Sequence, residues 1–232
     1  SLEEYVGRMK KDQKEIYYSL GASKEAIDLN PHLEIFKAKG LEVLYLYDPV
    51  DEFVVSSIRK HKDFDFKSVD GVDLKELDKL EDVEKNEEPK EKFSKEDDKA
   101  FGKLLLKMKE ILGDRVTEVH ESKRLKGSPS CLINSDDTMS STMQKILKMS
   151  NQGMAMPPQK RLMEINKDHK LIRNLMNVFK KNESDQFIAD TTEQLYESAL
   201  LLEGNLEDPH KLVNRLNKML TDASELYSKS NQ

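Results

Sequence analysis

Closely spaced glycines could bind a phosphate group, but this chain has none. A phosphate-binding loop needs glycines near one another so that backbone N–H groups can approach the anion. The nine glycines stand at positions 7, 21, 40, 71, 102, 113, 127, 153 and 204, and no two lie within ten residues of each other. The G-x-x-x-x-G-K and G-x-G-x-x-G motifs are therefore excluded.

Metal-binding patterns are also incomplete. A single cysteine, Cys131, excludes every zinc site built on cysteine pairs. His120 and Glu121 begin an H-E-x-x-H motif, but Arg124 stands where the second histidine would have to share the ion. We interpret the five histidines as surface or structural residues and predict no metal site.

Nucleophilic catalysis has one partial candidate. Gly21-Ala22-Ser23 resembles half of a nucleophile elbow, but Glu25 replaces the closing glycine, and Ser23 is better interpreted as a helix N-cap. With 44 Asp and Glu residues, carboxylates pair easily by chance, so none is assigned an acid or base role. We predict no catalytic residue in this chain.

An apolar stripe on a predicted helix could bind a partner. Its members follow helical spacing at i, i+4, i+7 and i+8: Met139, Met143, Ile146 and Leu147. Periodicity alone favours a buried core face. Unbranched, polarisable methionines also suit a surface that repacks against many partners, and three more methionines follow in a segment with glycine and proline.

The last two predicted helices carry a second set of apolar residues. These are Leu195, Ala199, Leu202, Leu212, Leu216, Met219 and Leu220. They could be buried within one chain. They could equally form a two-fold interface in which two helices from each subunit make a four-helix bundle. The spacing alone leaves both readings open.

The elements that position these residues predict a mixed α/β (α+β) fold. Strands are expected at 15–20, 41–47 and 64–69, with helices at 2–9 and 23–38 and from 48 onward. A strand, helix, strand order at this spacing implies a right-handed crossover and a parallel strand pair. Residues 1–77 are predicted to form a small α/β subdomain.

A charged stretch separates this subdomain from the rest. Sixteen of the 22 residues at 78–99 are charged, so we predict a linker or a solvated helix there. Residues 100–232 form the second predicted domain. Its expected helices are 101–108, ended by Gly113, then 139–149, 171–179, 184–202 and 209–227, and its expected strands are 116–124, 130–134 and 160–166.

Composition narrows the class of protein. Charged residues make up 35% of the chain, the net charge is −6 and the pI is near 5.5, which disfavours nucleic-acid binding. No apolar run approaches the ~20 residues that span a bilayer. One cysteine fits a reducing compartment, so we expect a cytoplasmic location. Ser1 and Glu4 form a capping box at the first residue, which hints at an excised fragment.

Five stretches, in one order over nearly the whole chain, resemble motifs of one known family. They are Ser1–Lys10 with Ile16–Tyr18, Leu41–Leu44 with Asp48–Phe53, Arg124–Leu132, Met163–Asn166 with His169, and Leu206–Pro209. The family is the ninety-kilodalton heat-shock chaperones, and the compact spacing is similar to that of its bacterial members. Lys167 and Lys170 depart from the family pattern, which has prolines around the histidine. The acidic terminal pentapeptide of eukaryotic cytosolic members is also missing.

This resemblance implies the end of a middle domain followed by a C-terminal dimerisation domain. The family's ATP and magnesium site lies in an N-terminal domain that this chain lacks, so the resemblance implies a non-enzymatic piece of an ATPase. It also implies a homodimer that holds unfolded or partly folded clients, with no nucleic-acid or membrane partner. The stripe Met139, Met143, Ile146 and Leu147 matches the family's client-contacting helix, and Phe53 matches an aromatic residue implicated with it. The alternatives are an independent small α/β enzyme and a free-standing helical adaptor.

Overall fold

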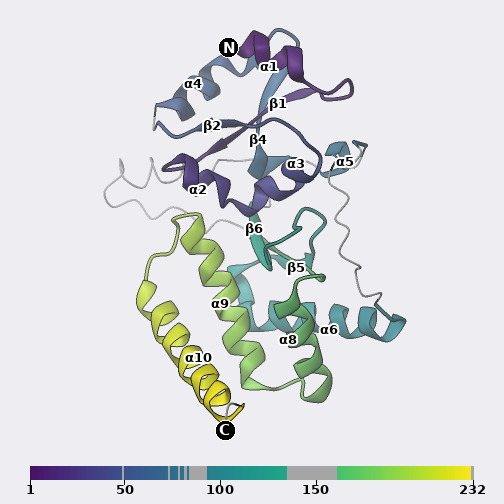
Figure 1. Ribbon diagram of the computed structural model, residues 1–232, viewed down its shortest axis with the longest axis vertical. Helices are drawn as coiled ribbons and strands as arrows, with labels where there is room; N and C mark the ends of the chain where they lie inside the picture. The colour runs from purple at the N-terminus through teal and green to yellow at the C-terminus, as the bar shows by residue number, and fades with distance from the viewer. Residues whose placement is uncertain are drawn as a thin grey trace.

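The computed structural model describes residues 1–48, 50–72, 74–77, 79–80, 83, 93–134 and 161–230. These residues form two units, each built on its own sheet (Figure 1). The mixture of helices and sheets confirms the predicted α/β class.

The first unit contains a four-stranded sheet with helices on both sides. Its elements are α1 (Leu2–Arg8), β1 (Glu15–Leu20), α2 (Lys24–Asp28), α3 (Glu34–Ala38), β2 (Leu44–Leu46), α4 (Asp51–Ile58), β3 (Lys60–His61), β4 (Phe64–Ser68) and α5 (Leu74–Leu77). The strand order is β2-β1-β4-β3, and β1 is parallel to both β2 and β4. In Figure 1, α1 and α4 lie on one side of the sheet, and α2 and α3 lie on the other. The parallel pairing predicted from the strand, helix, strand order is therefore present.

The core of this unit joins the sheet to α2 and α3. Tyr17 packs edge-on against Phe36, with ring centroids 4.9 Å apart. Tyr5, at 1% exposure, donates its hydroxyl proton to the carbonyl of Glu42 over 2.7 Å, so α1 is tied to the segment that enters β2. Burial of such aromatic side chains supplies a large share of the stabilisation of a small domain.

Two predicted elements of this unit differ from the structure. The helix expected over 23–38 is interrupted at Pro31, which begins a short 3₁₀ segment, because proline lacks an N–H donor and disfavours a helical residue before it. The strand expected over 41–47 is ordered as a strand only over Leu44–Leu46. Ser23 does cap α2, as predicted, and accepts a hydrogen bond from the N–H of Ala26.

The second unit packs helices on a three-stranded sheet. Its elements are α6 (Lys95–Leu112), β5 (Glu118–Glu121), β6 (Ser130–Asn134), β7 (Arg161–Ile165), α8 (Lys170–Lys181), α9 (Gln186–Leu202) and α10 (Pro209–Ser230). The strand order is β5-β7-β6, with β5 parallel and β6 antiparallel to β7. The consecutive strands β5 and β6 are therefore not neighbours. Buried residues of α6, α8, α9 and the sheet form one continuous core.

Helix α6 begins inside the charged stretch 78–99, which was predicted to be a linker or a solvated helix. Ser94 and Asp97 form a capping box, so the helix starts at Lys95 rather than after residue 99. Three acidic residues in its first turn, Glu96, Asp97 and Asp98, suit the positive end of the helix dipole. The end of the charged stretch is thus an ordered helix start.

The two units meet at the segment between β5 and β6. The Glu34 carboxylate accepts hydrogen bonds from three consecutive backbone N–H groups, those of Lys126 (2.5 Å), Gly127 (2.8 Å) and Ser128 (2.9 Å). A few residues earlier, the Arg124 guanidinium lies 3.3 Å from the Nδ1 atom of His32. Both contacts join residues about ninety positions apart in sequence.

Candidate functional site

Helix α4 presents apolar side chains to solvent. Phe53 is 48% exposed, and the neighbouring residues Tyr47, Val50, Val54 and Ile58 are exposed as well. The helix buries only Glu52 and Val55. An exposed cluster of large apolar residues on one short helix is the usual mark of a surface that contacts another protein.

The second predicted client-contact segment cannot be placed beside this helix. Met139, Met143, Ile146 and Leu147 lie outside the described residues. Strand β6, which leads into that segment, is described. It pairs with β7 on one side and contacts the first unit on the other. The assignment of these four residues and of Phe53 to client contact stays a prediction.

The seven residues predicted for a dimer interface divide into two groups. Leu195, Ala199 and Leu212 are each 6% exposed and are buried by their own chain, and Met219 is partly buried. Leu202, Leu216 and Leu220 are exposed. The spacing alone could not separate the two readings, and the structure assigns part of the set to the core of a single chain. The interface itself stays a prediction.

The exposed residues of α10 form a regular stripe. Val213, Leu216, Leu220, Ala223 and Tyr227 alternate in steps of three and four, which is the a/d pattern of a coiled-coil seam. All five are exposed, and Tyr227 reaches 74%. From Val213 to Tyr227 the stripe is roughly 21 Å long at 1.5 Å per residue. We call these five residues the α10 seam; only Leu216 and Leu220 were singled out from the sequence.

Ion pairs hold α10 against α9 and so orient the seam. The Arg215 guanidinium donates to Glu197 over 2.8 Å, and the Lys218 ammonium donates to Asp190 over 2.7 Å. The hydrogen bond that Lys218 donates to Asp190 raises the pKa of Lys218. Leu212 is buried as well. Helix α10 therefore has one face that packs on its own subunit and a different face that carries the seam. Figure 1 shows α10 lying along α9 at the outer edge of the unit.

Sequence reasoning missed the buried ion pair of Arg124 and Glu164. Arg124 is 4% exposed and Glu164 6%, and the guanidinium donates to the carboxylate over 3.2 Å. The Ser122 hydroxyl donates to the same carboxylate over 2.6 Å. Nothing local indicates this pair, because its members are forty residues apart.

Neither metal nor membrane features appear in the part of the chain that the structure describes. Within those ranges, His, Cys, Asp and Glu side chains nowhere gather in threes as a metal site would require. None of the described helices combines the length and apolar character needed to cross a bilayer. The lone Cys131 is buried, and burial raises the pKa of its thiol.

Comparison with known proteins gives a consistent result. The family described as "Hsp90 protein" matches residues 1–232. The chain is 44% identical over 228 residues to the chaperone protein HtpG of Oleidesulfovibrio alaskensis, which covers 98% of this chain and 35% of that protein. It is 37% identical over 227 residues to HtpG of Nitratidesulfovibrio vulgaris, again covering 98% and 35%. HtpG of Geobacter sulfurreducens is 40% identical over 210 residues, which cover 90% of this chain and 31% of that protein.

These matches agree with the motifs found along the sequence. The chain spans about a third of the length of the relatives it matches. Because the family match covers every residue and the relatives reported above are HtpG proteins of bacteria, this chain belongs to the Hsp90 family, in its bacterial, HtpG-like branch.

Proposed function

We propose that this chain is part of a chaperone that dimerises through the α10 seam and holds unfolded polypeptide on apolar surfaces. The observation that carries the proposal is the uncovered apolar area on α4 and α10. In a single copy, the seam and the face around Phe53 are exposed to water. Because exposure of large apolar side chains to water is unfavourable, burial of these side chains against a partner would stabilise the complex.

A second copy is the occupant that best fits the seam. Its members sit on a helix already held by two ion pairs, so the seam is presented as a rigid ridge. Two such ridges related by a two-fold axis, each backed by α9, make a four-helix bundle. The buried residues Leu195, Ala199 and Leu212 then serve the same assembly by fixing α10 on α9 within each subunit.

Unfolded polypeptide is the occupant that best fits α4. The exposed apolar residues of this helix, Phe53, Val54 and Ile58, differ in size and shape, which suits weak contact with many apolar sequences rather than one tight ligand. The named relatives are chaperones, which supports this assignment. Hydrolysis of ATP, with magnesium, belongs in this proposal to another part of a longer cytoplasmic protein.

Light scattering tests the dimer. Val213→Glu together with Leu220→Glu places two carboxylates on the seam, so we expect a dimer of the unmodified chain at tens of micromolar to become a monomer. Asn214→Glu with Thr221→Glu adds the same charge one position further along, where both residues are exposed, and should leave the mass unchanged. An unmodified chain that is monomeric at every concentration would reject the proposed interface.

A further inference from the structure

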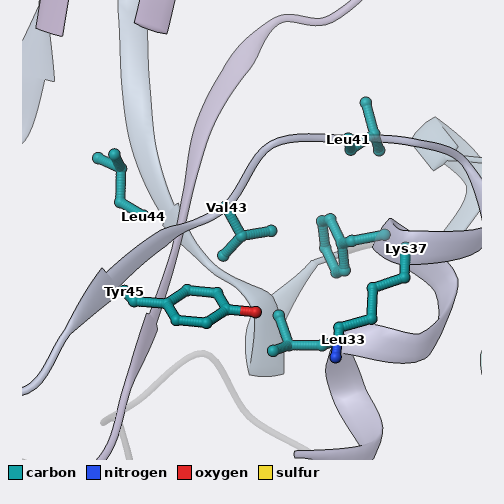
Figure 2. A pocket seen from close by; sticks show the side chains of 7 residues that line it. Leu33, Lys37, Leu41, Val43, Leu44 and Tyr45 are labelled. Carbon is teal, nitrogen blue, oxygen red and sulfur yellow. The ribbon is translucent and has the colours of Figure 1, made fainter. Parts of the chain in front are cut away.

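A pocket opens beside the edge strand β2. It has a volume of about 310 Å³, and its lining combines the Lys37 side chain with residues from the 3₁₀ segment η1 (Pro31–Leu33), from α3, from β2 and from the segment between α3 and β2: Leu33, Phe36, Leu41, Val43, Leu44 and Tyr45. Figure 2 shows the Tyr45 ring reaching towards Leu33 and Lys37, whereas Leu44 points away from them. The interior is therefore mainly apolar.

The polar groups at the rim are engaged with one another. The Tyr45 hydroxyl donates to Asp28 Oδ1 over 2.7 Å, and the Lys37 ammonium donates to the Asp28 carbonyl over 2.9 Å. Lys37 and Asp28 also form an ion pair at 3.5 Å. This network holds the tyrosine ring in place and leaves the rim close to neutral, so an uncharged apolar group suits the pocket better than an ion.

The strand beside the pocket has an open side. Among the described strands, β2 lies at the edge of the sheet and pairs only with β1. The Leu46 carbonyl accepts a hydrogen bond from Gly21 N–H, so the backbone groups of Leu46 point towards β1. Backbone N–H and C=O groups of successive strand residues point to opposite sides, so those of Tyr45 point away from β1. Tyr45 thus offers backbone hydrogen bonds at the edge while its ring lines the pocket.

We propose that the β2 edge binds an extended polypeptide segment by strand addition, with one large apolar side chain of that segment in the pocket. The proposal rests on the proposed function and names a second contact point for the same class of partner. An open strand edge requires an extended backbone as its partner, and backbone hydrogen bonds bind without regard to sequence. The pocket is at the lower limit of the roughly 300–1,000 Å³ typical of small-molecule sites, which fits one side chain rather than a cofactor.

Hydrogen exchange at the Tyr45 amide provides the direct test. The probe is a fluorescein-labelled peptide of about twelve residues that alternates threonine and leucine between terminal lysines. Saturating peptide should slow exchange of the Tyr45 N–H about tenfold or more, because the amide becomes a cross-strand donor. A peptide that binds without changing this amide would overturn the inference while leaving the proposed function standing. A peptide that does not bind at all would overturn both.

Two matched pairs separate strand addition from other modes of binding. N-methylation of alternate peptide residues removes donors from one edge of the peptide; one phase of methylation should abolish binding to β2 and the other should retain it. This pair needs no change in the protein, so it does not depend on the folding of a variant.

Val43→Lys places a charge in the pocket and should weaken binding about tenfold, whereas Leu106→Lys on α6, which changes an exposed apolar residue outside both proposed surfaces, should leave the protection of Tyr45 intact. Equal binding of the two N-methylated peptides would contradict the inference. So would a change in molecular mass of the Val43→Lys variant, because it would show that the β2 edge pairs with a second copy of the chain.

Discussion

At the scale of single residues, stability depends on buried charge pairs that could not be predicted from the sequence. Arg124 and Glu164 are both nearly inaccessible, so each neutralises a charge that would otherwise be costly to bury. His32 and Ser122 complete the polar surroundings of the pair. Such a network holds its geometry only when all its members are present.

Glu164→Gln should therefore be strongly destabilising. The substitution keeps the shape of the side chain but leaves the Arg124 guanidinium without its counter-charge, and we expect the free energy of unfolding in urea to fall by about 3 kcal/mol. Glu193→Gln is the matched control, because its pair with Arg115 is more exposed, and it should cost about 1 kcal/mol or less. Equal losses in the two variants would show that burial of the first pair has no special weight.

Tyr45 should titrate late. Loss of solvation, followed by the hydrogen bond to Asp28, raises its pKa from 10.0 to about 12. In the unfolded chain the phenol ionises near pH 10. The neutral Tyr45 side chain therefore contributes its full share to the free energy of unfolding below pH 10, and this contribution is lost as the pH rises towards 12.

The difference in ultraviolet absorbance between the parent chain and Tyr45→Phe should show a phenolate transition centred near pH 12. The stability advantage of the parent over this variant should decline over the same window. A transition near pH 10 would indicate that in solution the Tyr45 hydroxyl is neither shielded from water nor hydrogen-bonded to Asp28.

At the scale of elements, α4 combines a buried side with an exposed one. Its Val55 and Glu52 are buried, whereas Phe53 and Val54 are exposed. A helix of only eight residues would not be stable alone in water, so the position of its exposed apolar side depends on the burial of the other side within the unit.

Phe53→Ser should weaken client holding without loss of fold. Because Phe53 is half exposed, its removal should lower the melting temperature by no more than about 2 °C. Suppression of the aggregation of a chemically unfolded client, followed by light scattering, should weaken several-fold. Leu106→Ser removes an apolar residue from α6 that is even more exposed, at 73% against 48% for Phe53, and serves as the control. If both variants lose the same activity, α4 has no distinct role.

At the scale of the whole molecule, Glu34 links the two units. Its carboxylate holds the backbone of residues 126–128, which immediately precede β6, and the α4 surface belongs to the same unit as Glu34. The Glu34 side chain, together with the contact between Arg124 and His32, therefore helps to fix the position of the α4 surface relative to β6, the strand that leads into the predicted methionine-rich helix.

Glu34→Ala should loosen this link. Three charge-assisted hydrogen bonds are lost, and we expect the coupling between the units to weaken by about 2 kcal/mol. Calorimetry should then show two separated unfolding transitions, or a wider separation of existing ones, and X-ray scattering should show a larger radius of gyration. Glu25→Ala on α2 should change neither, because among the described residues Glu25 has no hydrogen bond or ion pair to the second unit. An unaltered calorimetric trace for Glu34→Ala would mean that other contacts hold the units together.

The sequence by itself determined the class of the fold, the family and most of the elements. Strand β1, helix α1 and the three long helices α8, α9 and α10 lie close to their predicted positions, because each has a clear hydrophobic period and a local capping signal. The family could be read from short motifs along the chain, and the comparisons bear it out.

Only the tertiary structure decided which apolar residues are covered and which distant polar residues meet. Leu195 and Leu220 have similar spacing signals, yet one is buried and the other is exposed, because burial depends on what packs opposite a helix rather than on the helix itself. The order of the strands decides that Arg124 pairs with Glu164 and that β2 lies at the edge of its sheet. The packing of one unit on the other decides that Glu34 accepts hydrogen bonds from residues 126–128. Local sequence carries no record of such contacts, since their partners are brought together only by the fold.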